Sequence, residues 1–254
     1  MMECRPYEAF AKTYDAWTAG FWEHHAERLD DLLAPARAKP GRALDLACGT
    51  GAGIAYLESR GFTPVGVDLE PEMIRVARQH LPHAELHVAD LRQLPELGCF
   101  QAVICCFDSI NYLLDADEWR ALFRSVYDRL EPGGLFVFDV LRLDDLERNW
   151  VEHVRVEEGP EGLYVERCSY DGHRRIGTTR RTFFHPETAR SWQRSDELHE
   201  QTTFDPVDIK AWLLGAGFTA VHVSDPGDVT EIPDCCQRVI LAASRSHRGR
   251  PSLA

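Results

Sequence analysis

Short apolar segments alternate with amphipathic segments through the first 148 residues of the chain. The apolar segments have the length of buried parallel strands, and the amphipathic ones repeat their apolar residues every three or four positions, as helices do. Expected strands lie at residues 43–46, 64–67, 85–88, 100–107 and 135–140, and expected helices at 7–33, 53–59, 72–80 and 117–130. This alternation predicts a doubly wound α/β fold around a mostly parallel sheet.

The pattern changes after about residue 148, where β-forming residues and turn sequences replace the amphipathic segments. Turns such as Asp171-Gly172 and His185-Pro186 separate four strand-like segments, at 152–157, 163–170, 174–185 and 192–203. They predict an antiparallel β-meander inserted after the fifth strand. A helix from Asp205-Pro206 to Leu214, followed by strands at 218–224 and 237–243, completes a sheet of seven strands.

These changes divide the chain into five expected parts. The parts are an N-terminal helical cap (1–35), an α/β core (36–148), the antiparallel β insertion (149–204), the completion of the core sheet (205–244) and a disordered tail (245–254). An aromatic stripe marks one face of the cap, formed by Tyr7, Phe10, Tyr14, Trp17 and Phe21. We expect the cap and the insertion to close over a substrate, with the insertion as a lid or an oligomer surface.

The charge balance narrows the range of partners. The chain has 28 basic and 41 acidic residues and a net charge of −13. Such a surface repels phosphate backbones and anionic lipids, which disfavours nucleic acid or a membrane as the main partner, although a local basic patch is compatible with it. No apolar run is long enough to span a membrane, and the N-terminus lacks the basic-then-apolar pattern of a signal peptide, so we expect a cytoplasmic protein. The sequence leaves a homodimer open.

The cysteines and histidines predict no metal site. Eight cysteines include the adjacent pairs Cys105-Cys106 and Cys235-Cys236. Neighbouring side chains of a strand point to opposite faces, so these pairs suit neither zinc nor a disulfide ladder. The 11 histidines do not cluster with cysteines or carboxylates at ligand spacing. Reduced thiols of this kind are typical of the cytoplasm.

A glycine-rich turn follows the first apolar strand, with glycines at 49, 51 and 53. The dinucleotide pattern Gly-x-Gly-x-x-Gly needs a glycine where this chain has Ile54, which argues against NAD or FAD. No Gly-Lys-Ser/Thr follows, which excludes a Walker loop for ATP. An acid precedes the turn at Asp45, and a second acid ends the next strand at Asp68. This arrangement predicts a nucleoside site where the strands end and a helix N-terminus offers free amides.

Asp45-x-Ala47-x-Gly49-x-Gly51 resembles motif I of the class I S-adenosylmethionine-dependent methyltransferases. The resemblance extends from about residue 40 to 141 and includes the turn Leu130-Glu131-Pro132-Gly133-Gly134. It implies a Rossmann-like fold and S-adenosylmethionine (SAM) as cofactor. It also implies that Asp68 binds the ribose hydroxyls, that Asp90 approaches the adenine amino group and that Phe107-Asp108-Ser109 lies beside the methionine moiety. The implied cofactor-binding residues are Tyr14, Asp45, Ala47, Gly49, Gly51, Asp68, Leu69, Asp90, Leu91, Phe107 and Asp108.

A narrower resemblance rests on three further segments. They are Asp108-Ser109-Ile110-Asn111-Tyr112-Leu113, Phe138-Asp139-Val140 and Glu197-Leu198-His199-Glu200-Gln201-Thr202-Thr203-Phe204. They resemble a bacterial group of small methyltransferases with a β-meander after strand five, and the layout is similar to that of aminosugar N-methyltransferases. This resemblance implies transfer of a methyl group to nitrogen or oxygen of a small molecule by in-line displacement. His199, Glu200 and Tyr112 are the candidate bases or substrate anchors.

Each assignment has an alternative. Asp45 could organise the turn, Asp68 and Asp90 could cap helices, and Tyr14 could belong to a packed aromatic stripe. Cys48 is expected to be a packing residue rather than a nucleophile. At the level of function, the alternatives are a SAM-binding regulator or cyclase without methyl transfer, and a methyltransferase acting on protein or RNA.

Overall fold

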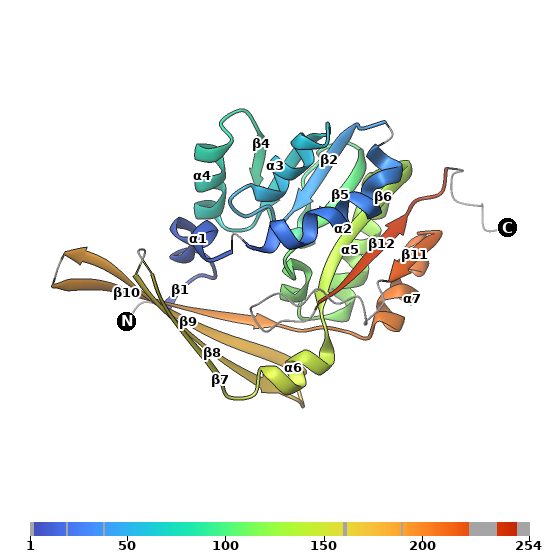
Figure 1. Ribbon diagram of the computed structural model, residues 1–254. Coiled ribbons are helices and arrows are strands. Elements are labelled where there is room, and N and C mark those ends of the chain that lie inside the picture. The colour runs from blue at the N-terminus through green and yellow to red at the C-terminus, as the bar shows by residue number, and fades with distance from the viewer. Residues whose placement is uncertain are drawn as a thin grey trace.

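A seven-stranded sheet forms the centre of the protein in the computed structural model (Figure 1), which describes residues 3–18, 20–37, 39–159, 162–188, 190–223 and 238–247. In spatial order its strands are β11 (Ala220–Val223), β12 (Arg238–Ser244), β6 (Leu130–Leu141), β5 (Phe100–Cys105), β2 (Arg42–Leu46), β3 (Thr63–Asp68) and β4 (Glu85–Val88). The five strands from β6 to β4 are parallel, whereas β12 is antiparallel to both β6 and β11. The predicted fold class is confirmed.

Helices cover both faces of this sheet. Along β5, Val103 and Cys105 pack on one face, and Ala102 and Ile104 pack on the other, because successive side chains of a strand alternate. The first face is covered by α5 (Ala116–Arg129) and α7 (Pro206–Ala216), and the second by α2 (Gly20–Arg37) and α3 (Ala52–Ser59). Helix α4 (Pro71–His80) packs near β4, where Ile74 and Leu86 share a small apolar cluster. This double cover explains why the inner strands β2 and β5 are almost entirely buried.

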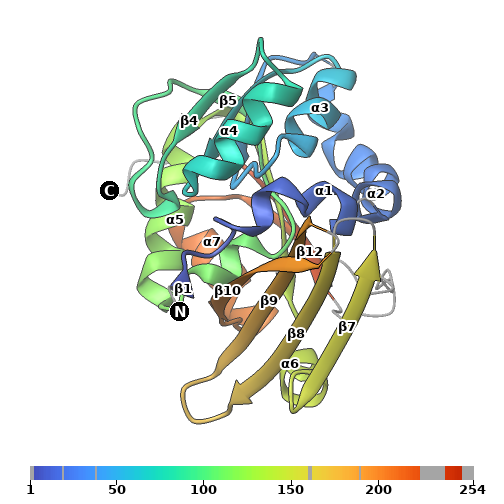
Figure 2. The same ribbon diagram turned by 90° about the vertical axis from the view of Figure 1, so that its left-hand side faces the viewer.

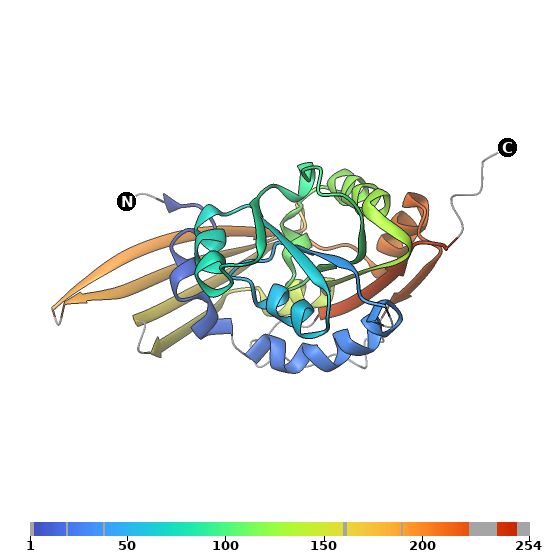
Figure 3. The ribbon, with the colours of Figure 1, turned by 90° about the horizontal axis from the view of Figure 1, so that it is seen from above.

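A second sheet of five strands lies beside the first (Figure 2). Its order is β1 (Glu3–Cys4), β10 (Ser191–Gln201), β9 (Ile176–Thr188), β8 (Gly162–Asp171) and β7 (His153–Gly159). Strands β7 to β10 form the predicted antiparallel meander, and short β1 pairs in parallel with β10. Seen from above, the second sheet extends away from the first, while α2 runs along the side of the first (Figure 3).

One buried asparagine ties both ends of the insertion to the core. The Nδ2 group of Asn111 donates to the carbonyl of Thr202 at 2.6 Å, and its Oδ1 accepts from the amide of Leu141 at 3.1 Å. Asn111 lies in the short helix η3 (Ser109–Tyr112), and α6 (Leu143–Asn149) follows Leu141. The meander is therefore fixed at the point where the chain leaves and re-enters the core.

The N-terminal segment differs from the single helix predicted over 7–33. It contains the short helices η1 (Phe10–Lys12) and α1 (Tyr14–Thr18) before α2. Tyr7, with a φ of 66°, has a left-handed backbone that no continuous helix accommodates. Helix α2 also continues to Arg37, past the end predicted at Pro35, because a proline near the end of a helix leaves the remaining turns intact.

The C-terminal segment departs from the predicted disorder at its start. The backbone of Arg245 exchanges hydrogen bonds with Gly133 and Gly134, and its guanidinium donates to the carbonyl of Tyr127 at 2.9 Å. Residues 248–254 and the pair Cys235-Cys236 lie outside the described residues. Within the described ranges, no helix has both the length and the apolar character needed to cross a membrane.

Candidate active site

A cavity of about 380 Å³ lies at the carboxyl ends of the parallel strands, and we call it the strand-end cavity. Nine of the predicted site residues line it, namely Tyr14, Ala47, Gly49, Asp68, Leu69, Asp90, Leu91, Phe107 and Tyr112. The strand-end cavity is also lined by residues that were not predicted from the sequence, among them Arg5, Tyr7, Glu70, Met73 and Arg92. Glu70 and Arg92 directly follow the predicted Leu69 and Leu91, whereas only the fold brings Arg5 and Tyr7 of the N-terminal segment to the strand ends. Such a position outside the carboxyl edge of the sheet is where doubly wound folds bind ligands.

Asp68 occupies the tip of β3 and organises the neighbouring turns. Its Oδ2 accepts from the Gly49 amide at 2.8 Å, and its Oδ1 accepts from the Glu70 amide at 2.9 Å. Burial raises the pKa of Asp68 to about 6, against the lowering effect of these amides. A carboxylate has about four lone-pair sites, so both oxygens keep capacity for hydroxyl donors of a ligand.

The glycine turn brings backbone close to the strand-end cavity. Ala47, with a φ of 58°, and Gly49, with a φ of 53°, both have left-handed backbones and line this cavity. Gly51 also has a left-handed backbone and directly precedes α3, but it does not line the strand-end cavity. Asp45 is also outside the lining: it is buried beneath the turn, where a Cβ on Gly53 would overlap its Oδ2. Burial and the charge of Asp68 raise the pKa of Asp45 well above its usual value.

Asp90 lines the strand-end cavity with its carboxylate already paired. Arg92 Nη2 donates to Asp90 Oδ2 at 2.6 Å, and the Arg92 amide donates to Oδ1 at 2.9 Å. The hydrogen bonds from Arg92 lower the pKa of Asp90, so it is ionised near neutral pH. A ligand amino group would share this carboxylate with Arg92.

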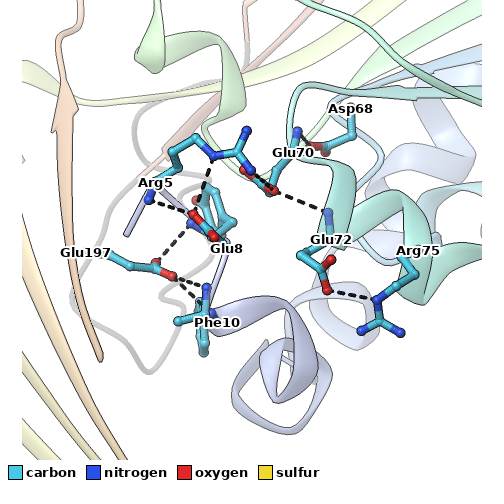
Figure 4. Close-up of polar contacts among 10 residues, drawn as sticks. Arg5, Glu8, Phe10, Asp68, Glu70, Glu72, Arg75 and Glu197 are labelled. Atoms are coloured by element: carbon cyan, nitrogen blue, oxygen red, sulfur yellow. Dashed lines mark hydrogen bonds and ion pairs between the residues drawn. The ribbon is translucent and has the colours of Figure 1, made fainter. Parts of the chain in front are cut away.

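Residues 3–18 form a strap across the strand-end cavity, held at both sides (Figure 4). On one side, Glu197 of β10 accepts from the amides of Tyr7, Ala9 and Phe10 at 2.8–3.0 Å. On the other side, the Arg5 guanidinium donates at 3.2 Å to Glu70, which lies two residues after Asp68. The strap therefore connects the meander to the turn that carries Asp68.

A second cavity of about 100 Å³ lies between the strap, the core and the meander, and we call it the inter-sheet cavity. Alternate residues of the meander line it, including Tyr164, Glu166 and Cys168 of β8. Three aromatic side chains line both cavities, namely Tyr7, Tyr14 and Phe107. The two cavities thus share one aromatic wall.

Asp108 lines the inter-sheet cavity rather than the strand-end cavity, which departs from its predicted place beside the cofactor. Its left-handed backbone, with a φ of 50°, turns the side chain away from the end of β5. There Oδ1 accepts from Arg238 Nη2 at 2.5 Å, and Oδ2 accepts from Gln201 Nε2 at 2.5 Å. Both carboxylate oxygens are therefore already engaged by protein donors.

A chain of hydrogen bonds runs from the shared wall into the protein. The Tyr7 and Tyr112 hydroxyls are 2.7 Å apart, and the Tyr112 hydroxyl is 2.8 Å from His199 Nδ1. His199 Nε2 lies 3.1 Å from Glu197 Oε2. The hydrogen bond from His199 and the strap amides outweigh burial and lower the pKa of Glu197. Burial, with the nearby Arg181 charge, lowers the pKa of His199 to about 4.

These pKa directions fix the protons of the chain. An ionised Glu197 only accepts, so the neutral His199 ring carries its proton on Nε2 and accepts at Nδ1. The Tyr112 hydroxyl then donates to His199 and accepts from Tyr7. Burial raises the pKa of Tyr112 well above its usual value, so this hydroxyl keeps its proton.

The three predicted catalytic residues do not stay together. Tyr112 lines the strand-end cavity, and His199 lies directly behind it, with 1% of its surface exposed. Glu200 lines neither cavity and pairs loosely with Arg174 at 3.8 Å. Adjacent strand residues point to opposite faces, so His199 and Glu200 could not both face the site. Glu197, two positions before His199 on β10, shares its face instead. The two-residue repeat of a strand was therefore the sequence signal that could have identified Glu197.

Comparison with known proteins agrees with this geometry. Residues 43–134 match a family model described as a methyltransferase domain. YqeM of Bacillus subtilis, named only as a candidate methyltransferase, is 28% identical and aligns over 94% of this chain and 97% of its own length. The Streptomyces venezuelae dTDP-3-amino-3,4,6-trideoxy-α-D-glucopyranose N,N-dimethyltransferase is 27% identical, with 84% and 91% covered.

A solved structure extends the comparison to the whole fold. SAM-bound CalS10, an amino pentose methyltransferase from Micromonospora echinaspora, is 26% identical and superimposes with a TM-score of 0.72, covering 92% of this chain and 96% of that one. The matched domain contains the glycine turn, Asp68 and Asp90, which line or support the strand-end cavity. Residues 43–134 thus match a methyltransferase domain, and almost the whole chain is similar to S-adenosylmethionine-dependent methyltransferases.

Proposed function

We propose that the protein transfers a methyl group from SAM to an amine or hydroxyl of a small-molecule acceptor by in-line displacement. The supporting observation is the meeting of two cavities at Tyr7, Tyr14 and Phe107. The strand-end cavity has the size of a cofactor site, whereas the inter-sheet cavity, at about 100 Å³, has room for a compact group only. Nitrogen is the favoured acceptor atom, because the relatives above are named as methyltransferases of amino sugars.

The residues of the strand-end cavity fit SAM. Asp68 would hold the ribose hydroxyls and Asp90 the adenine amino group, while Gly49 keeps the backbone accessible beneath the Tyr14 ring. When bound, SAM supplies a methyl group already activated on a sulfonium. The Tyr14 and Phe107 rings at the shared wall suit a cation, since aromatic faces carry negative charge density. The main task of the protein is then to align the acceptor and exclude water.

Tyr112 and His199 are the proposed proton-handling residues. An amine that arrives protonated must release one proton before its nitrogen can attack the methyl group, because an ammonium has no free lone pair. Tyr7 lines both cavities, so a proton released at the shared wall can pass through the Tyr7 and Tyr112 hydroxyls to His199 Nδ1. Glu197 beside Nε2 favours the resulting imidazolium, but burial and the Arg181 charge lower the pKa of His199 to about 4, so His199 would hold the proton only transiently. Glu200 has no part in this proposal, because it lines neither cavity.

Turnover with a panel of amino sugars, amino acids and phenols tests the proposal. Mass spectrometry should detect a methylated product and an equal amount of S-adenosylhomocysteine. Tight SAM binding without any product would favour the alternative of a SAM-binding regulator or cyclase. Methylation of protein or RNA, with no small molecule accepted, would favour the macromolecular alternative.

We also propose that the protein works in the cytoplasm. Five cysteines whose side chains the structure describes, among them Cys48 and the adjacent Cys105 and Cys106, are free thiols, as a reducing compartment maintains them. A homodimer stays a prediction that sedimentation would check.

A further inference from the structure

A row of alternating charges crosses the inner face of the meander. Arg155 of β7 stands opposite Glu166 of β8, Glu166 opposite Arg181 of β9, and Arg181 opposite Glu197 of β10. Arg155, Glu166 and Arg181 line the inter-sheet cavity. Opposite charges in directly facing strand positions attract each other, so the row supports the wall of this cavity.

Glu166 has one carboxylate oxygen engaged and one open. The Tyr164 hydroxyl and Arg181 Nε both donate to Oε2, the latter at 3.1 Å. Among the residues that the structure describes, no donor lies within hydrogen-bond distance of Oε1. The side chain is nonetheless buried, with 8% of the residue surface exposed. Burial opposes the charge, but Arg181 outweighs it and lowers the pKa of Glu166, so the group is ionised.

The other two acids of the inter-sheet cavity are occupied. Asp108 is held by Arg238 and Gln201, and Glu157 is paired with Arg155. An ionised carboxylate oxygen only accepts hydrogen bonds, so its partner must be an N–H or O–H group and not a carboxylate or phosphate. Because Glu166 lines the inter-sheet cavity, a ligand there can supply the N–H or O–H donor for Oε1.

Glu166 also lies away from the reacting region. It lines the inter-sheet cavity only, whereas the shared wall consists of Tyr7, Tyr14 and Phe107. We infer that Glu166 determines acceptor specificity: its Oε1 accepts a hydrogen bond from a second amino or hydroxyl group of the acceptor, which is not itself methylated. This contact orients the nucleophile toward the strand-end cavity. The inference rests on the proposed function, in which the acceptor binds in the inter-sheet cavity.

Two amine probes and a matched variant test it. D-Glucosamine carries hydroxyls beside its amine, whereas cyclohexylamine carries none. Glu166→Gln should weaken D-glucosamine in both KM and calorimetric Kd, measured in the S-adenosylhomocysteine complex, by about tenfold or more. Cyclohexylamine and SAM affinities should stay within about twofold. The control Glu187→Gln removes an exposed carboxylate from the same sheet and should change neither probe.

The outcomes separate the inference from the proposed function. Equal loss of both probes, or no loss of D-glucosamine, overturns the role of Glu166 and leaves methyl transfer standing. If Glu166→Gln selectively loses D-glucosamine binding but the wild type methylates neither probe, the role of Glu166 is supported and the proposed reaction is refuted. A wild type that neither binds nor methylates the probes overturns both. If Glu166→Gln does not fold, Glu166→Asp replaces it. This variant keeps the charge on a side chain that is one methylene shorter, and it must show the same selective loss of D-glucosamine affinity.

Discussion

The hydroxyl of Tyr112 and Nδ1 of His199 are 2.8 Å apart, although the two residues come from η3 of the core and β10 of the insertion. Tyr112 lines the strand-end cavity and His199 is buried behind it, so in the proposed reaction the pair would lead a proton from the cavity into the protein. The same hydrogen bond ties the core to the insertion at the site.

Tyr112→Phe removes the hydroxyl link without changing the ring. We expect kcat for an amine acceptor to fall by about 10²-fold, because proton transfer by a positioned group contributes at least that much. Calorimetric SAM affinity should change little. Tyr170→Phe is the matched control, because it removes the hydroxyl of a partly buried tyrosine on β8, outside the hydrogen-bond chain of Tyr112. Unchanged kcat in the Tyr112 variant would exclude the relay.

His199 makes stability depend on pH. Its pKa is about 4 in the folded protein, below the value of about 6.5 for an unfolded histidine. Between these values the unfolded chain binds a proton that the folded one does not, so stability falls as pH decreases from about 6.5 to 4. The resulting loss in the free energy of unfolding is about 3 kcal/mol. In urea unfolding, the difference between wild type and His199→Asn should therefore narrow over this range, and a constant difference would argue against a neutral His199.

Asp68 makes cofactor binding depend on pH in a neighbouring window. Its folded pKa is about 6, and the ribose hydroxyls need the ionised carboxylate as acceptor. SAM affinity should thus be full above about pH 7 and fall by up to tenfold per unit below pH 6. Calorimetry of wild type and Asp68→Asn checks this. The variant should bind weakly at all pH values, with no inflection near 6.

Gly53 gives the glycine turn its close contact with Asp45. Gly53→Ala would place a Cβ on Asp45 Oδ2 and against Trp22, which should destabilise the protein by roughly 1–3 kcal/mol and weaken SAM binding. Gly215→Ala is the control, since its Cβ would meet nothing within 4 Å and α7 should gain about 0.5–1 kcal/mol. Equal unfolding midpoints for the two variants would contradict this account.

The parallel sheet was predictable because its information is local. The apolar run at β5 and the glycine turn before α3 specify strand and turn within a few residues, and Asp68 follows from standing at a strand end. The position of Asp108 in the wall of the inter-sheet cavity could not be predicted, because its left-handed backbone is revealed only by the fold.

The acceptor side could not be predicted in the same way. Glu166 and Arg181 meet through the register between β8 and β9, which depends on turn lengths and on packing far from either residue. Tyr7 reaches the site because Glu197 holds the strap amides, a contact between residues 190 positions apart. Such pairings leave no periodic trace in one sequence.

Asn111 has a consequence for how this architecture diversifies. Asn111 binds both Leu141 and Thr202, so the roughly 60 residues between them begin and end at the same fixed point of the core. We expect insertions in the turns of the meander to leave the strand order of the core unchanged, because both hydrogen bonds of Asn111 stay in place. The freedom to vary is confined to these turns, since Glu197 and His199 on β10 of the same sheet hold the strap and Tyr112.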